Sequence, residues 1–549
     1  MNRPFSLASG FSVLPAMTAG DRSIYVSNAG NDLSDGLTPI TPKATIAAGK
    51  ALQRDATGDR LHLNRGDTWT EAYGSFSVSG ASATRRIVVT TYGTGARPRL
   101  QTGTTTAFDI PTGTTRSNIA IIGIEAEAHT AVGTTNALAG VMVAATATDI
   151  LIEDCYFTMF ETGINIPGGS VRKTRIAVRR CTLYRNFRTS GSDGHGLYAA
   201  NVDGLLMEEN TFHQNGYNPD VGGSVAFTMR HNVYIQGNCT DIESRGNLNA
   251  EASSHGLQMR SGGIVYDDCY LNCPNALLFG TTDAVLLAPV TVDASYFTIL
   301  GTGTINGSGG NSALNLEAVS SGTVRNFVIS KPSGTLGGAP LTLGGSVGLG
   351  SMTNMEVEDG VLYGWGGSIQ INGNGTQLAG SALRRMQVDS AHAGDFLVVY
   401  GALAGAQAVA HEGNRWNRSA GTTSWWYITG GSPATCTLAN WQAQVNDTGE
   451  TTGARSPAYT APTRTIGDYA ATLGLTASLD GFLTAARAQR QGNWNDALMA
   501  HAVNDYVGEG FDAARPAEEN TGNGRLWRRN STMGRVATTV AAAAAVRVN

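Results

Sequence analysis

A short strand-and-turn phrase recurs along the middle of the chain and constrains the fold more than any other feature. Ile152–Phe157 (IEDCYF) returns as Val178–Leu183 (VRRCTL), as Met207–Phe212 (MEENTF) and again from Val265 to Leu271. Such units, recurring every ~20–40 residues, are typical of a solenoid, in which each coil buries its apolar side against its neighbours. No helices separate the units, so a parallel sheet with crossover helices is not expected.

The composition fits many short strands joined by tight turns. The chain has 549 residues, of which 70 are glycine and only 15 % are charged. We therefore expect an all-β protein. A net charge of −5 gives no reason to expect nucleic acid as a partner, and no stretch is long and apolar enough for membrane insertion. The six cysteines lack paired zinc-type spacing, so we expect few or no disulfides.

Two terminal segments carry a resemblance to known proteins. Near the start the chain reads YVSNAGNDLSDG (25–36), PKATIAAGKAL (42–52) and GDRLHLNRGDTW (58–69). These phrases resemble the entry segment of the right-handed parallel β-helix superfamily of pectate-lyase-like proteins. Near the end, RTIGDYAATLGL (464–475) and AVNDYVGEGF (502–511) resemble the C-terminal tail of many bacterial β-helix proteins.

The resemblance and the repeats together predict a single-stranded right-handed parallel β-helix with an N-terminal cap and a small helical C-terminal appendage. The appendage is expected to lie on the last coil and hide its open sheet edge. The expected divisions are a lead segment that is a candidate for attachment (1–20), an entry cap (21–84), the β-helix (85–410), an irregular Trp-rich segment (411–460), a helical C-terminal cap (461–511) and a low-complexity tail (512–549).

Three histidines recur in register within this repeat. His195-Gly-Leu-Tyr198, His231-Asn-Val-Tyr234 and His255-Gly-Leu-Gln258 would stack ~4.8 Å apart on neighbouring coils. Histidine is suited to general acid or base catalysis because its pKa is near neutrality. The alternative is a polar ladder that only satisfies side chains inside the solenoid. Strict strand alternation would also put His195 and Tyr198 on opposite faces, unless the strand bends.

The neighbouring side chains suit a sugar substrate. Arg230 and Arg260 could neutralise the carboxylate of a uronic acid through their planar guanidinium groups. A second column of the repeat supplies Tyr198, Tyr234 and Gln258 as candidate substrate-binding residues. Tyr217, in the longer loop at 216–223, and Glu251, an acid of the same coils, complete this set.

The phrases Asp193-Gly-His195-Gly and His255 to Arg260 resemble motifs of β-helix alginate epimerases and lyases. The resemblance implies that a histidine is the base and adds Asp193 to the catalytic candidates. This chain has Gly194 where that family has proline, and Gly196 where it has aspartate. In chondroitinase-like lyases a lysine and an arginine move the proton, and only Lys173 could take the role of that lysine here.

Carboxylates offer a rival, hydrolytic mechanism. Glycosidases use two carboxyl groups ~5–9.5 Å apart, and neighbouring coils could supply such a pair from Asp193, Asp220, Glu243, Glu251, Asp267 and Asp268. We expect no metal site and no cofactor, because zinc requires nitrogens that converge on one point. The alternative is a divalent cation bound by the three histidines.

The sequence therefore predicts a polysaccharide depolymerase, a lyase or a glycoside hydrolase, that acts on extracellular or cell-surface glycan. The architecture resembles phage tailspikes, which are commonly trimers. Because residues 1–20 make a poor secretory signal, a virion tail with tail or baseplate partners and a homotrimer is expected ahead of a secreted bacterial lyase. The alternative from another class is a non-catalytic glycan- or receptor-binding tail fibre or adhesin, with Trp425 and Trp426 as stacking platforms.

Overall fold

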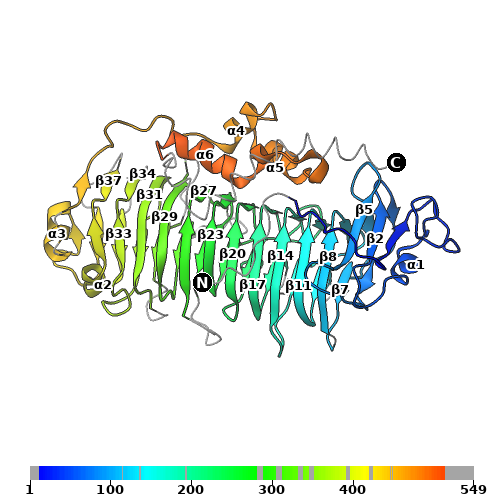
Figure 1. Ribbon diagram of the computed structural model, residues 1–549. Helices are drawn as coiled ribbons and strands as arrows, with labels where there is room; N and C mark the ends of the chain where they lie inside the picture. The colour runs from blue at the N-terminus through cyan, green and yellow to red at the C-terminus, as the bar shows by residue number, and fades with distance from the viewer. Residues whose placement is uncertain are drawn as a thin grey trace.

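The chain folds into one long stack of coils, and the predicted parallel β-helix is confirmed (Figure 1). The computed structural model describes residues 11–513, except 114, 135–137, 192–193, 281–288, 304–311, 332–337, 345–350, 391–395, 419–424, 446 and 448. Each coil contributes one strand to each of three faces, and strands in successive coils pair in parallel. Within the described residues no helix is long and apolar enough to cross a bilayer.

The first two faces form one 26-stranded sheet, because β29 (Ser321–Ser330) and β31 (Met355–Trp365) run through the corner between them. Besides these, the first face contains β1 (Ser23–Val26), β2 (Arg60–Asn64), β5 (Ile87–Tyr92), β8 (Thr115–Ile122), β11 (Thr146–Glu153), β14 (Lys173–Arg179), β17 (Val202–Glu208), β20 (Thr240–Arg245), β23 (Gly262–Tyr266), β26 (Thr291–Ser295), β33 (Ala382–Arg384) and β36 (Ala410–Glu412). The second face contains β3 (Thr68–Trp69), β6 (Arg99–Gln101), β9 (Glu125–Glu127), β12 (Tyr156–Thr158), β15 (Thr182–Tyr184), β18 (Thr211–His213), β21 (Leu248–Ala250), β24 (Cys269–Leu271), β27 (Thr298–Leu300), β34 (Gln387–Ser390), β37 (Arg415–Arg418) and β40 (Thr451–Thr452).

The third face is a 14-stranded sheet, parallel except for its last strand. Its strands are β4 (Gly74–Ser75), β7 (Phe108–Ile110), β10 (Ala139–Val143), β13 (Thr162–Ile166), β16 (His195–Ala199), β19 (Val233–Ile235), β22 (His255–Met259), β25 (Asn275–Phe279), β28 (Leu314–Leu316), β30 (Leu341–Leu343), β32 (Ile369–Ile371), β35 (Val398–Tyr400), β38 (Trp426–Ile428) and the antiparallel β39 (Thr435–Cys436). Coiling therefore continues beyond residue 410, into the segment that the sequence marks as irregular.

The first and second faces meet at a tight corner. One residue of nearly every coil there has a positive φ, as in Asp154 (56°) and Glu209 (53°), which turns the chain from one face to the next within a single residue. The next residue points inward, and the amides of Asn210 and Asn247 stack: Nδ2 of Asn210 donates to Oδ1 of Asn247 at 2.9 Å. These amides also accept backbone N–H groups, so the buried corner keeps its hydrogen bonds.

A second amide ladder lies at the corner between the second and third faces. Nδ2 of Asn186 donates to Oδ1 of Asn215 at 2.9 Å, and Nδ2 of Asn215 donates to Oδ1 of Asn232 at 3.0 Å. All three side chains are fully buried. This ladder fixes the direction in which the chain enters the third face, directly before the histidines.

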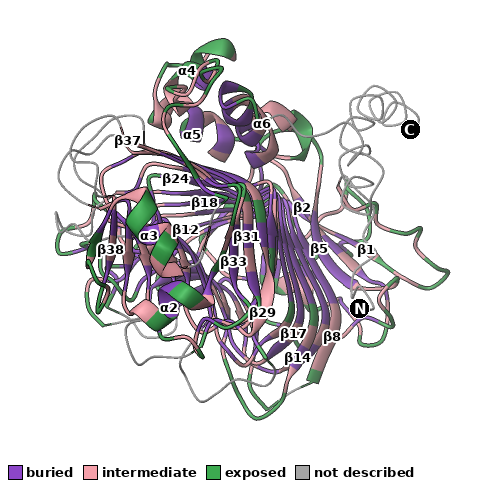
Figure 2. Cartoon of the chain, turned by 90° about the vertical axis from the view of Figure 1, so that its left-hand side faces the viewer, coloured by how far each residue is buried: buried purple, intermediate pink, exposed green. Residues whose placement is uncertain are grey.

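The solenoid interior is one continuous apolar core, and the strands around it are largely coloured as buried in Figure 2. Successive coils contribute Ile, Leu, Val and Phe side chains that are almost entirely buried, such as Ile152, Phe157 and Leu197. Cys155 and Cys181 belong to this core, whereas Cys269 lies one position later in the corner and packs on the outside, beneath the appendage. All six cysteines are buried and free.

The far end of the stack is closed by α2 (Leu403–Ala408) and α3 (Leu438–Val445), which lie in front in Figure 2. A tryptophan cluster ends the core there: the rings of Trp416 and Trp426 lie 5.9 Å apart, and those of Trp426 and Trp441 lie 5.3 Å apart. Trp426 is fully buried. The expectation that it forms a sugar-stacking platform is therefore wrong.

The C-terminal appendage lies on the side of the stack rather than on its last coil, which corrects the sequence-based expectation (Figure 1). It comprises α4 (Ile466–Thr472), α5 (Leu479–Arg487), two 3-10 turns (Gln491–Asn493 and Asp496–Leu498) and α6 (Ala500–Gly510). Its apolar residues pack on outward-facing residues of β21, β24, β29 and β31. At the N-terminal end of the stack, the short helix α1 (Ile46–Lys50) lies between β1 and β2 in the chain.

Polar contacts fix the appendage in place. Nη2 of Arg97 donates to Oδ1 of Asp154 at 2.6 Å and to the carbonyl oxygen of Gln489 at 2.8 Å. Nη1 of Arg487 contacts Nδ1 of His213 on β18. The N-terminal segment passes beneath the appendage, where the ring of Phe11 lies 5.3 Å from that of Trp494. Charged, aromatic and apolar contacts therefore hold the appendage against the solenoid and the N-terminal segment.

Asn210, Asn247 and Asp268 hydrogen-bond from coil to coil at the first corner and form the inner ladder. This ladder yields a prediction, because its third member is an aspartate rather than an asparagine. Burial raises the pKa of Asp268 to about 7, although Oδ2 accepts from Oγ of Ser244 at 2.5 Å. The folded state thus binds this proton more tightly than the unfolded chain, and stability decreases as pH rises from about 4 to about 7. Asp268→Asn removes that dependence.

We expect Asp268→Asn to be more stable than the natural protein at pH 8 by about 1–3 kcal/mol, and to differ little from it at pH 4, measured by thermal unfolding. The exposed Asp241→Asn makes the same charge change at the surface and serves as the control. A variant that is equally destabilised at both pH values would show that the ladder requires the carboxyl group.

Candidate functional site

The three histidines lie one above another at the start of the third face. His195 opens β16, His231 lies two residues before β19 in the next coil, and His255 opens β22 in the coil after that. The ring centroids of His195 and His231 are 5.3 Å apart, and those of His231 and His255 are 4.8 Å apart. The stack is therefore a continuous column of imidazoles.

A local departure from strand alternation places these imidazoles beside the tyrosines. A Cβ atom at Gly196 would lie 2.5 Å from the carbonyl oxygen of Asn232 and 2.8 Å from Nδ2 of Asn215, inside the solenoid. Gly196 therefore faces the interior together with Leu197, so His195 and Tyr198 share the outer side. Their rings stack at 5.6 Å. Only glycine fits at this position.

The tyrosine column runs parallel to the imidazole column. Tyr198, Tyr234 and Gln258 are paired in register on β16, β19 and β22. The ring of Tyr234 lies 5.0 Å from that of His231 and 5.5 Å from that of His195. Both tyrosines are half-buried, so part of each phenol ring is exposed at the outer surface of the third face.

The imidazoles are deeply placed. His195 is 3 % exposed and His231 2 % exposed, whereas His255 is partly exposed. Burial lowers the pKa of His195 and of His255 to about 3, and the positive charges of Arg230 and Arg260, respectively, add to the effect. Burial, then the two other histidines, lowers the pKa of His231 well below its usual value. All three rings are therefore neutral at neutral pH.

The hydrogen bonds assign the tautomers. Nδ1 of His231 accepts the backbone N–H of His255 at 3.4 Å, so this nitrogen carries no hydrogen. Nδ1 of His255 lies 3.2 Å from Nδ1 of His231 and 3.0 Å from Oγ of Ser254. With Nδ1 of His231 as an acceptor, the tautomer consistent with these contacts has its hydrogen on Nδ1 of His255. The Nε2 atom of His255 is then left with its lone pair. Ser254 is a functional candidate that sequence reasoning missed, because the repeat does not mark the position before the histidine as functional.

The two candidate arginines have different surroundings. Arg230 is 3 % exposed, and its guanidinium donates to the carbonyl oxygens of Arg188 (2.7 Å) and Gly191 (2.8 Å). It thus holds together the two loops beside the histidines. Arg260 is half-buried and its guanidinium carbon lies 5.5 Å from the ring centroid of Tyr234. Of the two, Arg260 is the better placed to meet a substrate carboxylate.

Two other candidates, Glu251 and Tyr217, take part in contacts other than those of the imidazole column. The carboxylate of Glu251 accepts from Nε2 of His213 at 2.8 Å and from Nε2 of Gln214 at 3.1 Å, and so supports the histidine that contacts the appendage. Tyr217 is half-buried in the loop after β18, and burial raises its pKa to about 12. The structure does not join either residue to the imidazole column. Asp193 lies outside the described residues.

The carboxylates of the rival mechanism are engaged in structural contacts. Asp268 belongs to the inner ladder, and Asp267 accepts from Nδ2 of Asn504 at 3.1 Å. Glu243 forms an ion pair with Arg245 of its own coil, and Asp220 forms one with Arg185 of the preceding coil. Lys173 is 1 % exposed and its Nζ donates to the carbonyl oxygen of Pro167. Within the described residues, no three His, Cys, Asp or Glu side chains are placed to hold a metal ion.

Comparisons with known proteins identify distant structural similarity only. No family model and no curated protein matches the chain. Among solved structures, a GH136 lacto-N-biosidase from Eubacterium ramulus aligns with a TM-score of 0.34 at 11 % identity, over 79 % of this chain and 67 % of that chain. A rhamnogalacturonan lyase aligns with a TM-score of 0.37 at 14 % identity (62 % and 82 %), and pectate lyase Pel9A with 0.34 at 16 % (64 % and 79 %). Similarity at this level assigns no activity.

The buried imidazoles predict how stability depends on pH. The unfolded chain protonates its histidines near pH 6.5, whereas the folded chain protonates His195 and His255 only near pH 3. The unfolded state therefore binds more protons in this window, and stability falls as pH decreases from about 6.5 toward 3. Replacing His195 by Gln should make this fall shallower by up to ~1.4 kcal/mol per pH unit.

The measurement is the free energy of unfolding from pH 4 to pH 7.5 for the natural protein and for His195→Gln. At pH 7.5 the variant should itself be less stable, because Nδ1 of His195 accepts the backbone N–H of His231. Parallel pH profiles of the two proteins would contradict the neutral, buried state of His195.

Proposed function

We propose that the protein degrades an acidic polysaccharide by β-elimination at the outer surface of the third face, with His255 as the base. The observation that supports this proposal is the contact between Nδ1 of His255 and Nδ1 of His231, because a hydrogen on Nδ1 of His255 leaves the lone pair on Nε2. His255 is also the least buried of the three rings. The two deeper histidines act as positioning residues that fix the tautomer of His255.

The proposed reaction balances without a cofactor. Nε2 of His255 removes the proton on C5 of a uronate, the electron pair forms the C4–C5 double bond, and the C4–O4 bond breaks. The phenol of Tyr234 or Tyr198 donates a proton to the departing O4. Arg260 faces the uronate carboxylate and stabilises the negative charge that develops there. The carboxylate in turn raises the pKa of the nearby imidazole and makes it a stronger base.

Single substitutions test this assignment. His255→Ala should lower the rate of cleavage of a uronate-containing polysaccharide by about 10²–10⁴-fold, measured as new ultraviolet absorbance of the unsaturated product. Tyr234→Phe tests the acid, and His129→Ala, a histidine on another part of the stack, is the matched control. Unchanged cleavage by His255→Ala, with the fold intact, would refute the role of this residue. New reducing ends without absorbance would indicate a hydrolase instead.

A second candidate function is glycan binding without cleavage. The near-complete burial of His195 and His231 supports it, because these rings then serve mainly to pack beneath the tyrosines. Tyr198 and Tyr234 would stack on sugar rings while the histidines remain structural. This function is supported if a glycan binds and is not shortened, and if Tyr198→Ala weakens binding while His255→Ala does not.

The biological setting remains a proposal from the sequence. A tailspike-like, trimeric receptor-binding protein on a virion tail is the proposed setting, and a secreted bacterial lyase is the alternative. Either places the enzyme outside the cell, where polysaccharide is its substrate. Sedimentation would distinguish a trimer from a monomer.

A further inference from the structure

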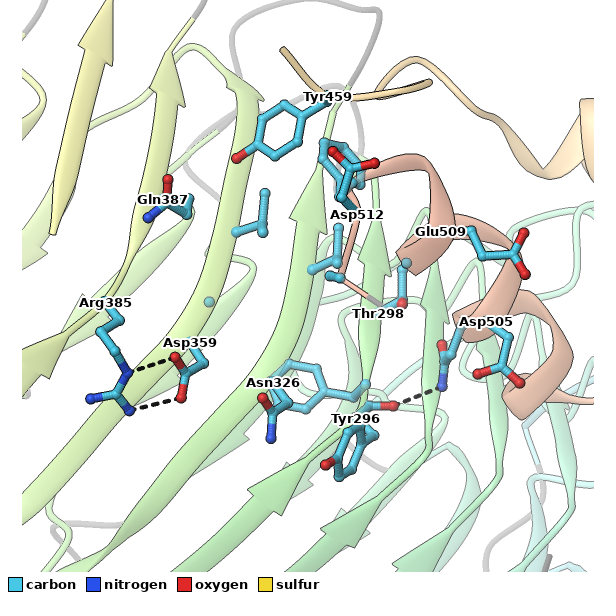
Figure 3. Close-up of a pocket in the computed structure, with 18 of the residues that line it drawn as sticks. Tyr296, Thr298, Asn326, Asp359, Arg385, Gln387, Tyr459, Asp505, Glu509 and Asp512 are labelled. Atoms are coloured by element: carbon cyan, nitrogen blue, oxygen red, sulfur yellow. Dashed lines mark hydrogen bonds and ion pairs between the residues drawn. The ribbon is translucent and has the colours of Figure 1, made fainter. Parts of the chain in front are cut away.

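An open cavity of about 810 Å³ lies between the appendage and the side of the solenoid (Figure 3). Its floor is formed by corner residues of successive coils, among them Tyr296, Asn326, Asp359 and Arg385, each with a positive φ between 51° and 58°. Because this backbone turns within one residue, the side chains project outward in a row. The cavity belongs to the first two faces of the solenoid, whereas the histidines lie on the third.

One side of α6 forms the opposite wall. Asn504 and Gly508, and likewise Asp505 and Glu509, are four residues apart and therefore lie along one side of the helix. The segment after α6 adds Asp512. The volume falls within the range of ~300–1,000 Å³ that is typical of small-molecule sites.

The charge distribution restricts what this cavity can hold. Arg385 is held by Asp359, with Nε 2.8 Å from Oδ1, and by Glu358 at 2.6 Å. Arg455 is held by Asp512 at 2.9 Å. Both lining arginines therefore already have carboxylate partners, and the wall carries further carboxylates. A uronate or another anion is disfavoured.

A metal ion is disfavoured as well, because among the described residues no three carboxylates converge as metal ligands. Carboxylate and amide oxygens that do not converge on a point can still accept hydrogen bonds from several separate hydroxyl groups. Tyr296 and Tyr459 line the cavity. The guanidinium carbon of Arg455 lies 4.6 Å from the ring centroid of Tyr459, so Tyr296 is the candidate ring on which the apolar face of a sugar can stack. This combination suits an uncharged, hydroxyl-rich ligand.

A buried acceptor gives independent support. Asn504 is 6 % exposed, and its Nδ2 donates to the carbonyl oxygens of Asp267 and Tyr296, both at 3.0 Å. These donations fix the orientation of the amide. Its Oδ1 is buried and lacks a hydrogen-bond partner in the described part of the chain. A buried acceptor without a donor costs free energy. Asn504 belongs to the cavity lining, so a ligand hydroxyl that displaces its neighbours and reaches this amide would supply the donor.

We propose that this cavity is a second saccharide-binding site that takes a neutral sugar unit. It is separate from the histidine column and does not require that column to be catalytic. Within a polysaccharide-active protein, such a site would hold uncharged parts of a glycan beside the solenoid.

Gly508 offers a direct way to fill the cavity. A Cβ atom there meets only the carbonyl oxygen of Ala513, at 3.4 Å, and leucine favours a helix more than glycine does. Gly508→Leu should therefore keep the fold and occupy the site. The matched control is Gly492→Leu, elsewhere on the appendage, where an added Cβ meets nothing within 4 Å.

The experiment is isothermal titration of the full chain with maltotriose, chitotriose, trigalacturonate and calcium chloride. We expect at least one neutral trisaccharide to bind in the millimolar range or more tightly, and Gly508→Leu to weaken that binding at least ~10-fold. Gly492→Leu should bind as the natural protein does. Glu509→Ala, at an exposed position, should weaken binding by a smaller factor and covers the case in which Gly508→Leu fails to fold.

The proposal is overturned if neither neutral trisaccharide binds, if trigalacturonate or calcium binds as well as they do, or if Gly508→Leu binds normally. Cleavage of uronate-containing polysaccharide, measured in parallel, should be unchanged in Gly508→Leu. Loss of activity in His255→Ala with normal trisaccharide binding would separate the two sites, so failure of one proposal leaves the other intact.

Discussion

The tight corner between the first two faces is the constraint on which the remaining structure depends. A positive φ at one residue turns the chain, and the next residue is then directed into the solenoid, where Asn210, Asn247 and Asp268 hydrogen-bond from coil to coil. Because each amide accepts the backbone N–H of its neighbour, the coils cannot slip without leaving buried groups unpaired. This register sets the vertical spacing of every outward-facing column, including the histidines and the cavity floor.

The amide ladder of Asn186, Asn215 and Asn232 fixes the register of the coils at the start of the third face in the same way. Asn232 is directed inward between His231 and Val233, and Gly196 fits against Asn215. Together they bring histidine and tyrosine onto one side of the sheet, although a regular strand would separate them. The chemistry proposed for His255 therefore depends on amides that never touch a substrate.

The sequence predicted much of the fold because strand repeats and turn residues are local signals. The stacking of coils followed from the recurrence of phrases such as Ile152–Phe157, and the register of His195 with His231 followed from their shared context. The sequence could not resolve whether His195 and Tyr198 share a face, because the answer depends on space around Gly196. It also misplaced the appendage and treated Trp426 as exposed, since both depend on contacts between segments distant along the chain. The cavity beside α6 has no sequence signal for the same reason.

The position of the appendage has a consequence for how the protein is made. Leu248, Leu271, Val328 and Val361 pack beneath helices that the ribosome produces more than 100 residues later. Until α4, α5 and α6 emerge, a nascent stack exposes this apolar strip to its surroundings, and chains prematurely terminated before α4 keep it exposed. Truncated translation products should therefore self-associate through a side wall rather than through an open end, which makes the last 50 described residues an intramolecular chaperone for coils synthesised long before them.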